Sequence, residues 1–425
     1  MSIPARLVGL TALVLAAAVG AADSAAKDIQ AAGCSQKDVQ AAIDAASDGD
    51  TVAVPAGEAT WRTSRENRPA VVLARKGVEK RLTLRGAGVG RTIITDATGP
   101  KCFQAVIKSS ESGIFSGVRE KAFRITGFTF RGNGADALIS AGGYTNWRID
   151  HCRFENGGRS LWVSGFGLID HCVFDKKRNG QSVFVSHSDF AGKPHGDGSW
   201  SSPLALGTDK AVYIEDCTFR YYADKPNAAL DGCYGARVVF RHNTLIDVSA
   251  ASHGTESGGR GRSIRSYEIY GNRFMLKKKK EHFTAIFLRG GTGVIFGNTV
   301  TGGYRSFVLA TNYRSEKAYA PWGKCDGTSK WDGNRLPNGY PALDQIGRST
   351  DSGAGTPQEL DPLREWDNTL NGADADIAVS GGPGVQAHVR KGRDFRNDAK
   401  RPGYEPYMYP HPLVRKQGDR PPGGS

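Results

Sequence analysis

Residues 149–154 read Ile-Asp-His-Cys-Arg-Phe, and the middle of the chain repeats this pattern of apolar-x-x-(Cys or Asn)-x-apolar. Each copy alternates apolar and polar residues like a short strand and then meets a turn at the Cys or Asn. A period of this kind indicates a solenoid in which each repeat is one coil. The fourth position is occupied in turn by Phe128, Cys152, Cys172, Cys217, Asn243, Asn272 and Asn298, in steps of 24, 20, 45, 26, 29 and 26 residues.

The length of the period selects the kind of solenoid. Three strands of about five residues, with three turns, fill one period, whereas the leucine pattern and helix of leucine-rich repeats are missing. We therefore expect an all-β fold, a right-handed parallel β-helix whose coils stack at about 4.8 Å. Asn243, Asn272 and Asn298 would form an amide ladder inside one turn, continued by three buried, reduced cysteines. The 45-residue step is either two coils or one coil with a long loop.

Composition excludes several other classes of protein. The 425 residues include 55 glycines, 39% are hydrophobic, and no later apolar run approaches the length of a membrane span. A multi-span membrane protein, a fibre and a largely disordered chain are therefore excluded. The seven cysteines show no CxxC pairs, which argues against structural zinc. The formal net charge of +13 predicts attraction to a polyanion, namely nucleic acid, an anionic membrane or an acidic polysaccharide.

The N-terminus indicates export. Arg6 precedes the apolar run Leu7–Val19, and small residues follow up to Ala22, as in a secretory signal peptide over residues 1–22. We therefore expect a secreted or periplasmic protein, acting as a monomer, with an acidic polysaccharide rather than nucleic acid as its partner. Residues 23–310 would form the β-helix. Residues 311–425 lose the repeat and are expected to be a loop-rich region that packs on the β-helix and caps it.

A short helix is expected before the first strands. Ser35 can cap it with Asp38 three residues on, an apolar stripe runs from residue 39 to residue 46, and the strand Thr51–Val54 follows. With the repeats and their Asn turns, this segment resembles the pectate-lyase-like superfamily, secreted bacterial right-handed β-helices with such a helix over the N-terminal end. The resemblance covers roughly residues 34–310. It implies an enzyme of the polysaccharide lyase or epimerase type that works on uronic-acid polymers in a groove beside the first sheet. Ca²⁺, which some members use, stays open because no acidic cluster is evident here.

Spacing from the turns places charged residues at strand ends. Pairs of the form x-Gly precede the turns, and they include Asp231, Arg260 and Arg289. If the coils stack, these three residues lie in one column on one strand face, where the two arginines repel each other unless a polyanion is bound. The Gly-rich loop 252–262 adds His253 and Glu256 just before the same strand.

These residue types suit β-elimination, which needs a neutralised uronate carboxylate and a base for the C5 proton. Arginine clamps a carboxylate with two hydrogen bonds, and histidine exchanges protons near neutral pH. We assign carboxylate binding to Arg260 and Arg289 and proton abstraction to His253, or to an arginine. Asp231 would orient His253 or an arginine. The residues expected to line the groove are Arg237, Glu256, Arg262 and Trp200, the last by stacking on a sugar.

Two other functions stay open. A β-helix glycoside hydrolase would use paired carboxylates, either Asp231 with Glu256 or Asp209 with Asp231, although arginine outnumbers acid in the expected groove. A non-catalytic polysaccharide-binding or envelope protein could have the same fold. In that case His253 would serve only the loop backbone, and the arginines would form a salt-bridge ladder with Asp231 and Glu268. The Asp-His-Cys triplets at 150–152 and 170–172 are expected to pack in the turn rather than to bind a metal.

Overall fold

The computed structural model describes twelve segments of the chain. They are residues 26–63, 69–75, 78–98, 102–110, 122–142, 145–177, 180–222, 228–256, 259–277, 284–333, 339–351 and 357–416. The expected signal peptide, residues 1–22, lies outside the described residues. No helix in these segments is long and apolar enough to cross a membrane.

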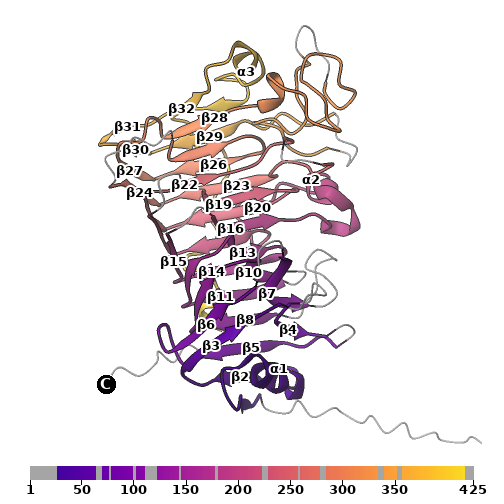
Figure 1. Ribbon diagram of the computed structural model, residues 1–425. Coiled ribbons are helices and arrows are strands. Elements are labelled where there is room, and N and C mark those ends of the chain that lie inside the picture. The colour runs from indigo at the N-terminus through magenta and orange to yellow at the C-terminus, as the bar shows by residue number, and fades with distance from the viewer. Residues whose placement is uncertain are drawn as a thin grey trace, which may run out of the picture.

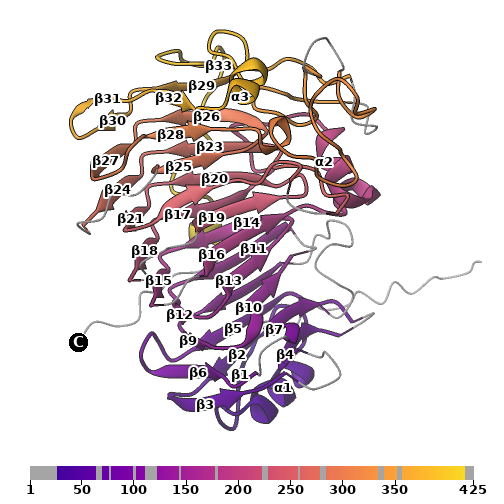
Figure 2. The ribbon, with the colours of Figure 1, turned by 45° about the horizontal axis from the view of Figure 1, so that its top comes forward.

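The chain winds through three sheets in succession, here named sheets A, B and C (Figures 1 and 2). Sheet A consists, in spatial order, of β1 (Asp28–Gln30), β2 (Thr51–Val54), β5 (Leu82–Gly86), β8 (Phe123–Thr126), β11 (Thr145–Asp150), β14 (Phe166–Asp170), β17 (Val212–Glu215), β20 (Arg237–Arg241), β23 (Ser266–Tyr270), β26 (Thr292–Phe296), β29 (Leu363–Trp366) and β33 (Phe395–Arg396). Sheet B consists of β3 (Gly57–Trp61), β6 (Thr92–Asp96), β9 (Thr129–Gly132), β12 (Arg153–Asn156), β15 (Val173–Lys176), β18 (Thr218–Tyr221), β21 (Thr244–Ile246), β24 (Arg273–Leu276), β27 (Thr299–Gly302), β30 (Thr369–Leu370) and β31 (Ala373–Asp374). Sheet C consists of β4 (Val71–Ala74), β7 (Cys102–Ser110), β10 (Ala135–Ala141), β13 (Arg159–Val163), β16 (Gln181–Ser186), β19 (Ala228–Cys233), β22 (Ser249–Ala251), β25 (Ile286–Leu288), β28 (Val308–Ala310) and β32 (Ile377–Val379).

Each coil takes one strand from each sheet, in the order A, B, C. Neighbouring strands are parallel, except for β30 and β31, which pair antiparallel. The protein is therefore all-β and a right-handed parallel β-helix, as the repeat predicts. Strands β14 and β17 are direct neighbours, so the 45-residue step is one coil with a long loop. That loop carries η1 (Phe190–Gly192), η2 (Pro194–Gly196) and α2 (Asp197–Trp200).

The turn between sheets A and B holds the predicted ladder. The backbone N–H of Asn243 donates to Oδ1 of Asn272 at 2.9 Å, and that of Asn272 donates to Oδ1 of Asn298 at 3.0 Å. The backbone N–H of Asn298 donates in the same way to Oδ1 of Asn368. Asn368 therefore extends the ladder by one residue that the sequence repeat did not predict. Cys152, Cys172 and Cys217 continue the column as free thiols, each 1% exposed. Each amide side chain satisfies a buried N–H of the preceding coil, which fixes the register between coils.

A helix covers the N-terminal end of the coil. At the N-terminal end α1 (Gln36–Ala45) is capped by Ser35, whose hydroxyl accepts from the N–H of Asp38, and it buries Val39, Ala42 and Ile43. This is the helix that the sequence predicts, and it lies beside β2 at the lower end of the molecule in Figure 1.

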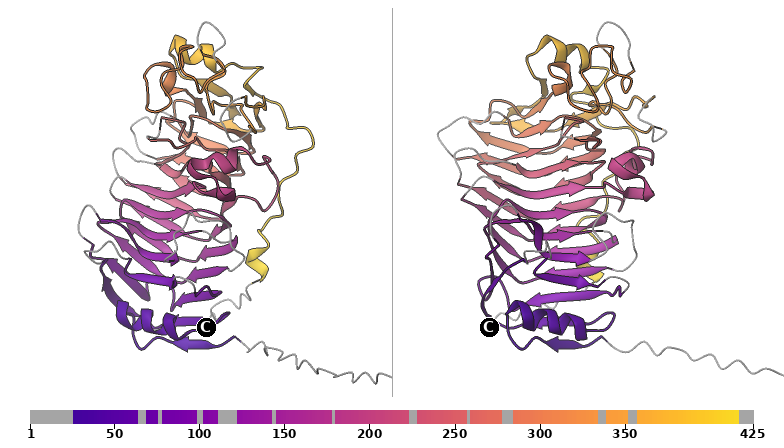
Figure 3. Two further views of the ribbon diagram at one scale, coloured as in Figure 1. Left: turned by 90° about the vertical axis from the view of Figure 1, so that its right-hand side faces the viewer. Right: turned by 45° about the vertical axis from the view of Figure 1, so that its right-hand side comes forward.

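The parallel sheets continue beyond residue 310, where the sequence suggested that the β-helix ends. Strands β29, β30 and β32 add one more coil. The segment between β28 and β29, which includes η3 (Tyr313–Ser315), is an insertion that separates this coil from the preceding one in the sequence. The chain end then turns back along the outside of sheet A, past α3 (Pro383–His388), to α4 (Leu413–Lys416) (Figure 3). Arg241 holds this C-terminal segment through the carbonyls of Tyr407 and Met408.

Candidate functional site

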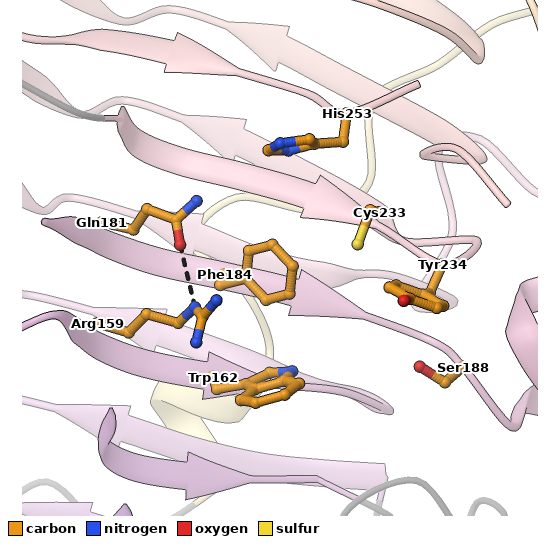
Figure 4. A pocket seen from close by; sticks show the side chains of 8 residues that line it. All are labelled: Arg159, Trp162, Gln181, Phe184, Ser188, Cys233, Tyr234 and His253. Atoms are coloured by element: carbon orange, nitrogen blue, oxygen red, sulfur yellow. Dashed lines mark hydrogen bonds between the residues drawn. The ribbon is translucent and has the colours of Figure 1, made fainter. Parts of the chain in front are cut away.

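A cavity of about 490 Å³ opens on the outer face of sheet C (Figure 4). Strands β13, β16 and β19 supply most of its wall, and the turns that follow β16, β19 and β22 supply the rest. The lining residues are Arg159, Trp162, Gln181, Phe184, Ser188, Cys233, Tyr234 and His253.

Aromatic rings form one part of the wall. Trp162, Phe184 and Asp231 are paired across β13, β16 and β19, so they share one outward-facing column. The Trp162 and Phe184 rings meet edge to face at 5.8 Å, and the Arg159 guanidinium lies 5.0 and 4.9 Å from their centroids. Aromatic rings with a planar cation suit the apolar face and polar substituents of a sugar.

A chain of hydrogen bonds joins the histidine to this wall. Nδ1 of His253 lies 2.7 Å from Oδ1 of Asp231. The other carboxylate oxygen of Asp231 accepts from Gln181 at 2.6 Å, and Oε1 of Gln181 accepts from Nε of Arg159 at 3.0 Å. Nη1 of Arg159 then donates to Asp136 at 2.7 Å. The Asp231 side chain is 3% exposed and that of His253 is 25% exposed, so a buried carboxylate supports an accessible imidazole.

This arrangement assigns the roles of the two ring nitrogens. A carboxylate that receives two amide N–H groups and faces Nδ1 favours the tautomer with its proton on Nδ1. The N–H of Gly232 also donates to Asp231, at 2.9 Å. Nε2 of His253 is then the nitrogen that can accept a proton from a molecule in the cavity. The structure brings Asp231 and His253 together, and the orienting role of Asp231 stays a prediction.

Arg289 lies beside His253 but does not line the cavity. Its Nε donates to the carbonyl of Ser252 at 2.7 Å, and its Nη1 lies 2.9 Å from Glu256. Glu256 is 6% exposed and Arg289 12% exposed in their side chains. The two expected site residues therefore form a mostly buried ion pair next to the histidine, and Glu256 offsets the charge of Arg289.

Arg260 is not in the column of Asp231, so this expectation was wrong. It belongs to the loop between β22 and β23, which interrupts the spacing that was counted back from Asn272. Its guanidinium lies 3.1 Å from Asp197 and is stacked on Trp322 and Trp331, at 4.6 and 5.2 Å. Arg260 therefore attaches the loop to neighbouring segments.

Arg262, Arg237 and Trp200 do not line a groove either, because the two arginines are buried beneath the long loop and Trp200 is a buried residue of that loop. Arg262 pairs with Asp344 at 2.6 Å and also with Asp351. The guanidinium of Arg237 donates to backbone carbonyls and to Ser199, and burial lowers its pKa to about 10. Trp200 is fully buried and donates to the carbonyl of Ser263. A buried indole cannot stack on a sugar.

Each acid of the carboxylate pairs considered for a hydrolase has a partner of its own. Asp231 serves His253, Glu256 serves Arg289, and the exposed Asp209 lies next to Lys210. Within the described segments no Asp or Glu lines the cavity, and no group of three or more His, Cys, Asp or Glu side chains could hold a metal ion.

The floor beside the cavity contains a histidine that must stay neutral. His187 precedes the lining residue Ser188, its Nε2 lies 2.7 Å from the Gly165 carbonyl, and its Nδ1 accepts from the N–H of Arg237. Burial lowers the pKa of His187 from 6.5 to about 4. The unfolded chain therefore binds a proton between these pH values that the folded protein does not bind.

We expect the free energy of unfolding to fall by about 3 kcal/mol as the pH drops from 6.5 to 4. In this range His187 takes up a proton in the unfolded chain but not in the folded protein, which favours unfolding. The change His187→Gln keeps a donor and an acceptor without a titrating ring. Urea unfolding at several pH values should show a smaller acid loss for this variant. An equal loss in the variant and the parent protein would show that other groups dominate.

Of the eight residues that line the cavity, sequence reasoning proposed only His253. The missed residues are Arg159, Trp162, Gln181, Phe184, Ser188, Cys233 and Tyr234. Trp162 and Phe184 nevertheless follow turn residues Cys152 and Cys172 by similar intervals. Counting forward from each turn would have placed their strands beside β19. Tyr234 had no such signal, because its position depends on Gly261, where a Cβ would come within 2.5 Å of the tyrosine ring.

Comparison with known proteins identifies fold relatives only. No family model matches the chain, and no curated protein matches it. Among solved structures, an alginate lyase from Paenibacillus sp. str. FPU-7 is 13% identical, with a TM-score of 0.40 over 66% of this chain and 99% of that one. The catalytic domain of a GH87 alpha-1,3-glucanase in complex with nigerose is 10% identical, with a TM-score of 0.35 over 88% and 67%. The A-module of an Azotobacter vinelandii mannuronan C-5 epimerase is 15% identical, with a TM-score of 0.35 over 86% and 96%. Likenesses at this level carry no argument about the substrate.

Proposed function

We propose that this protein is a carbohydrate-active enzyme that removes the C5 proton of a uronate in an acidic polysaccharide. The observation that supports this most directly is the bond of 2.7 Å between His253 and the buried Asp231, at the wall of a cavity that also contains Arg159. A base held by a buried carboxylate, beside a cation and aromatic rings, provides what proton abstraction from a charged sugar requires.

The proposed reaction is β-elimination. Nε2 of His253 takes the C5 proton, the electron pair of that C–H bond forms the C4–C5 double bond, and the bond from C4 to the glycosidic oxygen breaks. The departing oxygen takes a proton from water. The uronate carboxylate, which makes the C5 proton acidic once its charge is offset, is bound by Arg159. The hydrogen bonds of Arg159 to described residues occupy Nε and Nη1, and its side chain is 29% exposed.

Arg159 thus takes the role that the sequence analysis gave to Arg260. Arg289 flanks the same site and contributes through its backbone contact at Ser252, next to His253. An epimerase would begin with the same proton abstraction and return the proton to the opposite face of C5. We also propose that the protein is exported, because residues 1–22 have the pattern of a signal peptide.

The test is exposure of the purified protein to a panel of acidic polysaccharides. Ultraviolet absorbance of unsaturated uronates and release of reducing ends are followed together. A lyase produces both signals in parallel. Reducing ends without absorbance would indicate a hydrolase, and incorporation of solvent deuterium without new ends would indicate an epimerase. A protein that binds the polymers and yields none of these signals would contradict the catalytic proposal.

A further inference from the structure

A second cavity lies further along the outer face of sheet C. Its volume is about 310 Å³, and β25, β28, η3 and the turn after β32 form it. The register continues across the sheet from Leu230 to Ala250 and Ile286, so Phe287 stands in the same outward column as Asp231. The lining residues are Phe287, Leu309, Thr311, Tyr313, Glu316, Ser380, Gly381 and Gly382.

The two cavities differ in charge. Arg159 and His253 line the first cavity, and their carboxylate partners Asp136 and Asp231 are not among its lining residues, whereas Glu316 itself lines the second cavity. Among the described residues no Lys, Arg or His lines the second cavity. Arg289 lies between the two cavities, 5.4 and 5.7 Å from the ring centroids of Phe287 and Tyr313, but Glu256 offsets its charge.

The second cavity is suited to an uncharged sugar. A uronate placed beside Glu316 would bring two carboxylates together, and Arg289, the cation near the rings of this cavity, is already paired with Glu256. An uncharged pyranose can donate its hydroxyls to Glu316 and lay its C–H face on the rings of Phe287 and Tyr313, whose centroids are 6.1 Å apart. The hydroxyls of Thr311 and Ser380, 2.8 Å apart, supply further polar contacts.

One polymer chain can occupy both cavities. The strand order β19, β22, β25, β28 separates the Asp231 strand from the centre of the second cavity by three steps. At about 4.8 Å a step, the separation is about 14 Å. A sugar in a chain advances by a length similar to one such step, so two sugars a few units apart would be bound together.

We propose that the second cavity binds an uncharged sugar of the substrate, so that the polymer is a heteropolysaccharide rather than a pure polyuronate. This inference rests on the proposed function, because the first cavity must hold the uronate. Glu316 and Tyr313 are then residues that determine specificity and take no part in the proton transfer.

Binding can be measured without turnover by using the His253→Ala protein and isothermal titration calorimetry. The probes are hexasaccharides of equal length, from hyaluronan and gellan for mixed polymers and from polygalacturonate for a pure polyuronate. We expect at least one mixed probe to bind about tenfold more tightly than the polyuronate. In the His253→Ala protein, the further change Glu316→Gln should raise the affinity for the polyuronate. The ratio of the affinity for the mixed probe to the affinity for the polyuronate should therefore decrease. Tyr313→Ala should weaken the binding of the mixed hexasaccharide but not the binding of a disaccharide. Asp374→Asn, an exposed acid on sheet B, is the control.

The outcomes separate the two proposals. If the polyuronate binds as tightly as every mixed probe, or if Glu316→Gln leaves the ratio unchanged, the second cavity does not select an uncharged sugar. If the mixed probe is preferred but the wild-type protein forms no unsaturated product, the inference about specificity stands and the lyase reaction is wrong. If no probe binds, both proposals are overturned.

Discussion

Replacement of His253 by alanine is expected to reduce turnover of the acidic polymer by about 10³-fold, because Nε2 is the base for the C5 proton. The side chain is 25% exposed and its ring contacts Asp231, so its removal deletes little packing. The melting temperature should therefore change little. The rate of formation of unsaturated uronate is the measurement, and imidazole added to the variant should restore part of the lost rate.

Two companion variants make this prediction sharper. Asp231→Asn should lower kcat with little effect on KM, because Asp231 orients the base while the aromatic wall that binds the sugar stays intact. His195→Asn replaces an exposed histidine of η2 outside the cavity and should behave like the wild type. If His253→Ala retained full turnover, the assignment of the base would be wrong even if the fold were unaffected.

Replacement of Arg262 by methionine is expected to lower the free energy of unfolding by about 3–5 kcal/mol, the usual cost of breaking a buried ion pair. Arg262 is fully buried, and its guanidinium lies 3.0 Å from Asp197, 2.6 Å from Asp344 and 2.5 Å from Asp351. Burial by itself lowers the pKa of Arg262, but Asp344 and Asp351 raise it above the ordinary value. Without the arginine, these carboxylates would be buried without their main counter-charge.

Urea unfolding is the measurement, and Arg75→Met is the matched control. Arg75 pairs with Asp44 at 3.0 Å, but both side chains are nearly half exposed, so its loss should cost no more than about 1 kcal/mol. Arg262→Lys should lose an amount of unfolding free energy between those of the two methionine variants, since an ammonium keeps the charge but cannot span three carboxylates. Equal stability of Arg262→Met and Arg75→Met would show that the long loop and the residues after 339 do not depend on this ion-pair cluster.

The candidate site was predictable where it follows the repeat. His253 and Asp231 stand on neighbouring coils at the ends of β22 and β19, so spacing brings them together. Arg289, on the next coil, was predicted beside them for the same reason. The placement predicted for Arg260 was wrong because the loop after β22 changes the spacing. The role predicted for Trp200 was wrong because an aromatic residue suited to a sugar is equally suited to a buried interface.

The sequence by itself determined the parallel β-helix, the cysteine and asparagine column and the N-terminal helix. These features depend on contacts between equivalent positions of successive coils, and the repeat places the same residue types there each time. Only the tertiary structure decided which arginines are accessible. Arg262 meets Asp344 and Asp351 from 82 and 89 residues away, and these two acids belong to an insertion with no repeat. No periodicity encodes such a contact, because it is set by where two loops dock and exclude water. The side chain of Arg159 stays 29% exposed, whereas Arg237 and Arg262 are buried.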